Sequence, residues 1–365
     1  MKRIKCLSLI GLGLLLSSLS YGEKQKIKIF VVSSYHKSYL WSQSTQQGLT
    51  DAMLNYGYLD NIQQAEAFTK NDHVESSKVI IKKAWMNTKR KNGFKDIAKN
   101  TARIMESIDA FGPDLVLLGD DNAANYIGNQ LLDTPIPVIF WGINGLPLKY
   151  GLVESMDSPG HNITGVWQAG YPKESLDLLK RLTPEVKTFA ILACDSETSR
   201  PRVKQIENLA KNSKLPLKLV GLVVTNSFSD FKTKTLELVP RVDAFFILNH
   251  DTLMDDQGNH VDMLKVGKWY LENVKKPEVA PEPQFIREGM LATASDSGYN
   301  QSYKAFEMAY DILEQGLNPS RMRTVIPPKG PLMVNRIRAN TLGISLEDKM
   351  DIIDEIIEES VALKK

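Results

Sequence analysis

The segment Asp114-Leu-Val-Leu-Leu-Gly-Asp-Asp-Asn122 joins a short apolar run to a cluster of polar residues. An uninterrupted apolar run of this kind predicts a strand that is buried on both faces, as in a parallel sheet. The preceding segment, 94–111, has the pattern of a helix, and Gly112-Pro113 ends it. A helix that leads into a buried strand is part of a right-handed βαβ unit.

The same alternation continues on both sides of this segment. Further strands are expected at 26–32, 62–68, 137–141, 188–193, 217–225, 244–248 and 289–295, and further helices at 41–56, 74–89, 172–182, 202–212, 228–239, 261–274 and 299–313. A last helix is expected after the capping pattern Ser345-Leu-Glu-Asp348. Strands that alternate with helices predict an α/β fold with parallel sheets.

The length of the chain predicts two lobes. Without an N-terminal leader peptide the chain has roughly 340 residues, which is more than a domain with a single hydrophobic core usually contains. Irregular stretches rich in Gly, Asn and Pro suggest where the chain passes between lobes. The expected limits are 23–144 with 298–320 for the first Rossmann-like lobe, 164–284 with 332–365 for the second, and 145–163, 285–297 and 321–331 for three hinge crossings.

The N-terminus has the layout of a secretory signal peptide, residues 1–22. A basic start is followed by the apolar run 6–16, and Ser20 and Gly22 fit the cleavage positions. The run is about half of the roughly 20 residues that cross a bilayer. Its removal would change the formal charge of +2 to about −1, which gives no reason to expect nucleic acid as a partner. Cys194 would remain as a single thiol, and export without disulfides suits a periplasm.

Polar residues follow the strands in both halves, at the edge where open parallel sheets bind ligands. The candidate ligand-binding residues are Ser33, Ser34, Tyr35, Asp120, Asp121, Trp141, Asn144, Asn249, Asp251, Ser295 and Asp296. The acids could contact an ammonium or hydroxyl groups, the serines an anionic group, and the two aromatic residues a ring. Few Arg or Lys residues stand at these strand ends, which favours a cationic or polyhydroxyl ligand.

Structural explanations compete with these assignments. Asp120, Asp121 and Asn122 could cap the next helix, and Trp41 could belong to the core. The run 89–91 suggests a solvated cluster of charge. No His pair has the spacing of metal ligands, and the phosphate-loop, dinucleotide and nucleophile-elbow motifs are missing, so we expect no metal, no cofactor and no catalysis.

Several segments resemble type I periplasmic binding proteins, in the group of ABC-transporter substrate-binding proteins related to tryptophan and tyrosine binders. They are 136–144 with 151–153 and 159–166, then 243–251, then 289–296 with 332–335 and 342–344. The resemblance implies two lobes joined by three crossings, with a small molecule enclosed between them. It also implies delivery of that molecule to the membrane permease of an ABC importer.

The sequence departs from that group at two places. Asn144-Gly145 stands where many members have Asp-Pro, and 120–123 stands where many have a loop with Thr. With 33–36 and 41–42, these segments look more like a branch that also forms the sensing part of bacterial receptors. A periplasmic sensory module is therefore the alternative function, and a two-domain enzyme is a third.

Overall fold

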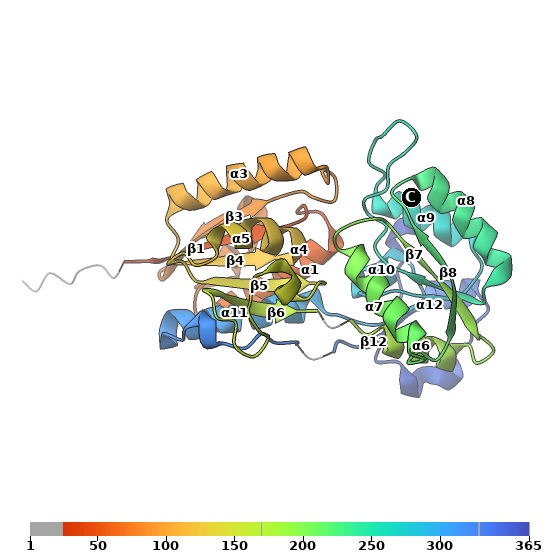
Figure 1. The fold of residues 1–365 in the computed structure, drawn as a ribbon. Helices are drawn as coiled ribbons and strands as arrows, with labels where there is room; N and C mark the ends of the chain where they lie inside the picture. The colour runs from red at the N-terminus through yellow and green to blue at the C-terminus, as the bar shows by residue number, and fades with distance from the viewer. Residues whose placement is uncertain (1–24, 169, 328, 365) are drawn as a thin grey trace, which may run out of the picture.

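The protein consists of two lobes that lie side by side, each with one sheet between helices (Figure 1). The computed structural model describes residues 25–168, 170–327 and 329–364. The predicted signal peptide therefore lies outside the described residues. Within those ranges, no helix has both the length and the hydropathy that a membrane span requires.

The first lobe is built on a sheet with six described strands. They are β1 (Ile27–Ser33), β2 (His73–Glu75), β3 (Val79–Trp85), β4 (Leu115–Gly119), β5 (Val138–Ile143) and β6 (Ile163–Trp167). Their order is β2-β3-β1-β4-β5-β6, with β2 antiparallel to β3 and the other pairs parallel. The expectation of a parallel sheet is thus confirmed, apart from one edge strand.

Helices cover both faces of this sheet. They are α1 (Leu40–Asn55), α2 (Ile62–Asn71), α3 (Phe94–Phe111), α4 (Asp120–Asn122), α5 (Asn129–Leu131) and α11 (Gly298–Gln315), with a π-helix at Ala123–Gly128 and 3-10 helices at Pro147–Tyr150 and Pro319–Arg321. Ile29 and Val31 belong to the apolar cluster that includes α1 and α11, whereas Phe30 and Val32 belong to the cluster beneath α3. Alternate residues of β1 therefore point to opposite helical layers, which explains its uninterrupted apolar sequence.

The second lobe has a sheet with seven described strands. They are β7 (Thr188–Ala193), β8 (Lys218–Val224), β9 (Ala244–Ile247), β10 (Glu278–Val279), β11 (Ala292–Ala294), β12 (Leu332–Asn335) and β13 (Glu355–Ile357). Their order is β13-β12-β11-β10-β9-β7-β8, and β11 and β12 form the antiparallel pair.

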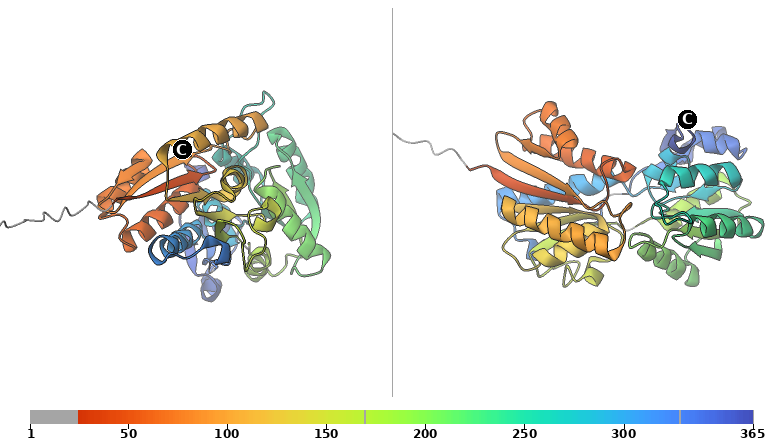
Figure 2. Two further views of the ribbon diagram at one scale, coloured as in Figure 1. Left: turned by 60° about the vertical axis from the view of Figure 1, so that its left-hand side comes forward. Right: turned by 90° about the horizontal axis from the view of Figure 1, so that it is seen from above.

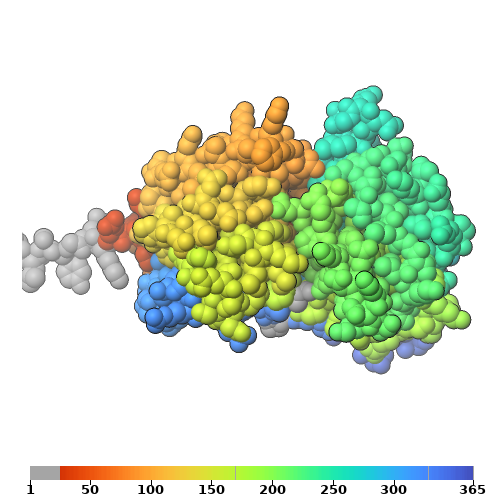
Figure 3. Space-filling model, in the orientation of Figure 1, coloured from red at the N-terminus to blue at the C-terminus, as the bar shows by residue number. Residues whose placement is uncertain are grey.

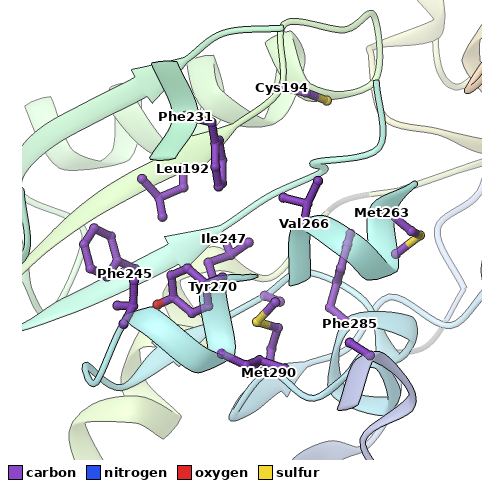
Figure 4. Close-up of a cluster of buried hydrophobic side chains, with 14 of the residues drawn as sticks. Leu192, Cys194, Phe231, Phe245, Ile247, Met263, Val266, Tyr270, Phe285 and Met290 are labelled. Carbon is purple, nitrogen blue, oxygen red and sulfur yellow. The ribbon is translucent and has the colours of Figure 1, made fainter. Parts of the chain in front are cut away.

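The helices of the second lobe again form two layers. They are α6 (Pro172–Leu182), α7 (Ser199–Lys211), α8 (Phe228–Leu238), α9 (Met263–Asn273), α10 (Pro283–Glu288) and α12 (Arg336–Thr341), with 3-10 helices at Val239–Arg241, Glu347–Ile352 and Val361–Leu363. Figure 4 shows side chains of β7 and β9 facing Val266 and Tyr270 of α9. The rings of Phe245 and Tyr270 meet edge to face at 6.1 Å.

The chain passes between the lobes three times, seen from above in Figure 2. The passages lie between β6 and α6, between β11 and α11, and between Val325, which bridges to Val166, and β12. Two predicted limits need correction, because β6 places 164–167 in the first sheet and β11 places 292–294 in the second. The short strand β6 contains Gly165 and follows Asn162, so its sequence looks irregular. The strand expected at 289–295 is present as β11, and only its assignment to a hinge crossing is wrong.

Three predicted elements are wrong. Residues 62–68 lie in helix α2, which Asn61 caps by accepting a hydrogen bond from the backbone N–H of Gln64. The segment 74–89 forms β2, β3 and the loop after them instead of a helix. The expected C-terminal helix is a 3-10 turn followed by β13, so Ile357 packs as part of a strand.

Candidate functional site

Two glycines allow close packing where β4 and β5 end. A Cβ on Gly119 would lie 2.5 Å from the indole of Trp141, and a Cβ on Gly142 would lie 2.5 Å from Oδ1 of Asp120. Asp120 has a φ of 70°, a left-handed conformation that is uncommon outside glycine, and a π-helix follows it. Strained backbone of this kind is typical of functional positions.

Asp120 is a buried carboxyl group held by the first lobe. The indole N–H of Trp41 donates to its Oδ1 at 2.7 Å. Burial raises the pKa of Asp120 well above its ordinary value, and the neighbouring Asp121 raises it further, against the hydrogen bond from Trp41. A cation placed beside Asp120 would lower this pKa and favour the ionised carboxylate.

Asp121 and Ser34 are occupied within the first lobe. Oδ1 of Asp121 accepts from the backbone N–H groups of Asn144 and Gly145 and from the hydroxyl of Tyr150, and Oδ2 accepts from the side chain of Asn144. The hydroxyl of Ser34 donates to the carbonyl of Gly119 at 2.7 Å and accepts from the N–H of Ala123 at 2.8 Å. These bonds fix the loops after β4 and β5.

Asp251 of the second lobe binds two residues of the first. The ammonium of Lys89 lies 3.0 Å from Oδ1 and 2.9 Å from Oδ2, and the hydroxyl of Tyr39 donates to Oδ2. Burial acts to raise the pKa of Asp251, but the charge of Lys89 and these hydrogen bonds outweigh burial and leave the pKa below its ordinary value. Both partners of this ion pair are buried, at 3% and 2% side-chain exposure.

Arg202 of α7 forms a second buried bridge. One of its amino groups donates to Asp296 at 2.6 Å and to Gln168 at 2.7 Å, and its Nε donates to Asn144 at 2.9 Å. Arg202 thus connects the second lobe to β5 and β6 of the first lobe and to the passage before α11. Nearby, Asn125 of the first lobe donates to Glu197 of the second at 2.7 Å.

Several buried polar atoms near these bridges have no hydrogen-bond partner among the described residues. They are Oγ of Ser33 and Ser295, Nε1 of Trp141, Nε2 of Gln301, Oδ1 of Asn249, Oε2 of Glu282 and Oε1 of Gln284. Buried polar groups almost always have partners, and each unpaired group costs about 1–3 kcal/mol. Atoms of this kind indicate where an enclosed molecule would form bonds.

Three of these atoms are acceptors, and the orientation of two of them is fixed by their neighbours. The amide of Asn249 donates to Asp251, and that of Gln284 donates to Tyr39, whose own proton is given to Asp251. Each amide therefore leaves its oxygen unpaired. Glu282 adds a carboxylate oxygen, and burial raises its pKa to about 7, although Arg202 and Lys89 act to lower it.

Both lobes line hollows at their junction, where the atoms of the two lobes touch along the middle of the molecule (Figure 3). One of about 290 Å³ is bounded by Lys89 and Thr198, one of about 450 Å³ by Trp41 and Gln284, and one of about 510 Å³ by Asn144 and Pro201. Tyr35, Tyr39 and Trp41 also pack into the apolar cluster of the second lobe. The described chain contains no group of three His, Cys, Asp or Glu residues arranged to hold a metal.

The structure gathers the predicted strand-end residues from both lobes at one junction, and it adds partners that the sequence did not indicate. Lys89 is buried and paired, so the interpretation of 89–91 as a solvated cluster is wrong for this residue. Lys89 and Arg202 neutralise Asp251 and Asp296, which corrects the expectation of unmatched carboxylates. Asp120, Asp121 and Glu282 are buried acids of this site that form no ion pair within the described residues. Tyr39, Glu282, Gln284 and Gln301 were also missed.

Comparison with known proteins shows the family. The family model described as ABC transporter substrate binding protein matches residues 81–354. The chain belongs to this family. A tyrosine-binding protein from Clostridioides difficile is 27% identical over 180 residues, which is 49% of each chain, so the match spans about half of that relative.

Solved structures share the fold. The ABC domain from Streptococcus pneumonia in complex with L-Trp has a TM-score of 0.70 and 21% identity, covering 91% of this chain and 100% of that one. The ligand-free, open structure of a substrate-binding protein with adhesive properties from Clostridium difficile has a TM-score of 0.61 and 21% identity, covering 91% and 99%. The predicted type I periplasmic binding protein fold and the relation to tryptophan and tyrosine binders are confirmed.

Proposed function

We propose that the protein is an exported binding protein that encloses a small molecule with an amino group between its lobes. It delivers this molecule to the membrane permease of an ABC importer and does not change it chemically. Family membership supports the transport role. The basic and apolar start of the sequence supports export into a periplasm.

The unpaired acceptors of the second lobe support an amine as the ligand. Asn249, Glu282 and Gln284 each leave one oxygen without a partner among the described residues, and their polar neighbours are already paired. An ammonium donates three hydrogen bonds and accepts none, so it matches three acceptor oxygens. The buried carboxyls of Asp120 and Glu282 would supply its counter-charge.

Aromatic side chains support a ring or an apolar portion in the same molecule. Tyr35 and Tyr39 meet edge to face at 5.1 Å, and Trp41 lines the hollow of about 450 Å³. The relatives are consistent with this ligand class, because one is named a tyrosine-binding protein and another was solved with L-Trp. Asp121 and Ser34 are assigned a structural role, since their hydrogen bonds hold the first lobe together.

A thermal-shift screen of the purified protein tests the proposal. The probes are L-tyrosine, L-tryptophan and aromatic amines, each paired with its N-acetylated form. An amine at 100 times its Kd should add about 2.7 kcal/mol to the free energy of unfolding, and the bound compound should be recovered unchanged. Equal shifts with acetylated and free amines, or no shift with any amine, would contradict the proposal.

Binding of an amine is expected to strengthen as the pH rises from 6 to 8. Glu282 has a pKa of about 7, raised by burial, so it is mostly protonated at pH 6 and mostly ionised at pH 8. A bound ammonium requires the ionised form, and affinity should therefore be about tenfold higher at pH 8. Titration calorimetry across this range measures the change, and Glu282→Gln should bind more weakly and lose most of the pH dependence. An unchanged pH profile in that variant would assign the effect to another group.

A further inference from the structure

A second groove lies in the first lobe, next to the hollow beside Trp41. It has a volume of about 820 Å³, and its lining residues come from α1, α2, the end of β3 and the adjoining loops, all between His36 and Arg90. No lining residue belongs to the second lobe. An occupant of this groove would thus be held by the first lobe alone.

A buried lysine fixes the orientation of an amide in this groove. The ammonium of Lys83 donates to Oε1 of Gln46 at 2.6 Å and lies 4.1 Å from the ring of Trp85. Because Nζ of Lys83 donates this bond, the amide oxygen of Gln46 faces Lys83 and the amide nitrogen points elsewhere. That nitrogen, Nε2 of Gln46, is buried and has no partner in the described chain.

Two further donors of the same lining are also unpaired. The indole N–H of Trp85 and the hydroxyl of Ser42 are buried without a partner among the residues that the structure describes. Gln46 and Ser42 are only 6% and 2% exposed. Because an indole N–H and an amide NH₂ can only donate, an acceptor is what would satisfy this group of atoms.

The charges and the walls of the groove narrow the choice of ligand. Lys37, Lys70 and Arg90 line it with the acids Asp51 and Glu66, and Lys37 forms an ion pair with Asp72, so these charges balance and the unpaired donors are what favours an acceptor. The side chains of Ile62 and Ala65 form an apolar wall, and Ile62 is 53% exposed. A ligand that matches the groove would have oxygens that accept hydrogen bonds and an apolar portion. A carboxylic acid with a ring or a branched chain has both.

We propose that this groove is a second binding site, for a small apolar carboxylate whose oxygens accept hydrogen bonds from Gln46, Trp85 and Ser42. The apolar part of the molecule lies against Ile62 and Ala65. The groove adjoins the hollow beside Trp41, since Gln43 and Gln47 line both, but its unpaired donors differ from the unpaired acceptors of the amine site between the lobes. It also takes the opposite charge.

Benzoate is the probe, and benzamide is its neutral control. In a ¹⁵N-labelled sample, the indole N–H signal of Trp85, assigned through Trp85→Phe, should shift as benzoate is added and should not shift with benzamide. Titration of the wild-type protein should give saturable binding of benzoate. Absence of a shift at Trp85, or equal shifts with benzoate and benzamide, would overturn the proposal.

Variants separate this site from the one between the lobes. Ser42→Ala removes a donor with little change in shape, Trp85→Phe removes a donor and one ring of the indole, and each should weaken benzoate binding about tenfold. Glu282→Gln should leave benzoate binding unchanged, since Glu282 lies at the junction of the lobes. Loss of benzoate binding in Glu282→Gln, with Ser42→Ala unaffected, would place the acid at the junction and overturn the proposal.

Discussion

Replacing Arg338 with methionine should lower the free energy of unfolding by about 3–5 kcal/mol, because it leaves a buried carboxylate without its counter-charge. Nε and Nη2 of Arg338 donate to the two oxygens of Glu278, each at 2.9 Å, and Nη2 also donates to the carbonyl of Val274 at 2.9 Å. The two side chains are 2% and 0% exposed. Urea unfolding monitored by circular dichroism measures the change.

The same helix offers a matched control. Arg336 forms an ion pair with Glu358 at 2.7 Å, but both side chains are largely solvated, at 37% and 64% exposure. Arg336→Met should therefore cost less than about 1 kcal/mol. Adding Glu278→Gln to Arg338→Met should restore part of the loss, since it removes the buried charge. Equal effects of the two arginine substitutions would show that burial of the pair does not matter.

Replacing Lys89 with methionine should open the two lobes and weaken binding of an amine between them. The substitution leaves Asp251 buried without a cation, and separation of the lobes lets water reach its carboxylate. Loss of one partner of such a pair costs about 2–5 kcal/mol, which corresponds to a decrease in affinity of about 30-fold to a few thousand-fold. Small-angle scattering should show a larger radius of gyration, and calorimetry should show the weaker binding.

Lys91→Met is the control for this substitution, since Lys91 is exposed and lies two residues further along the same loop. It should change neither the scattering nor the affinity. The double variant Lys89→Met with Asp251→Asn should close again in part, because no unpaired charge remains at the junction. An unchanged scattering profile in Lys89→Met would mean that this ion pair does not hold the lobes together.

The sequence was sufficient where a whole strand is buried. Uninterrupted apolar runs mark β1, β4, β5, β7 and β9, so these strands can be identified without knowing what packs against them. The polar residues that follow each strand can then be located directly. The strand β3 was missed because Lys82 and Lys83 interrupt its apolar pattern, although Lys83 is itself buried. Lys89 lies after the end of β3, so its position at a strand end could not be predicted once β3 was missed.

Other site residues have no local signal. Arg202 lies on α7, and the direction in which a helix presents a side chain to another lobe depends on how the lobes are placed. Glu282 and Gln284 follow β10, a strand of two residues that is too short to have a recognisable period. Their role as acceptors depends on which of their amide and carboxyl atoms already form hydrogen bonds with neighbouring groups.

The position of α11 has a consequence for the synthesis of the protein. This helix, blue in Figure 1, covers one face of the first sheet through Ala305, Phe306 and Ala309, although every strand of that sheet comes before residue 168. A chain leaving the ribosome therefore has a complete first sheet with one face covered by α1 but not yet by α11 while more than a hundred further residues are made. Both lobes can finish folding only near the end of translation, so a nascent chain should stay bound to chaperones for most of that time.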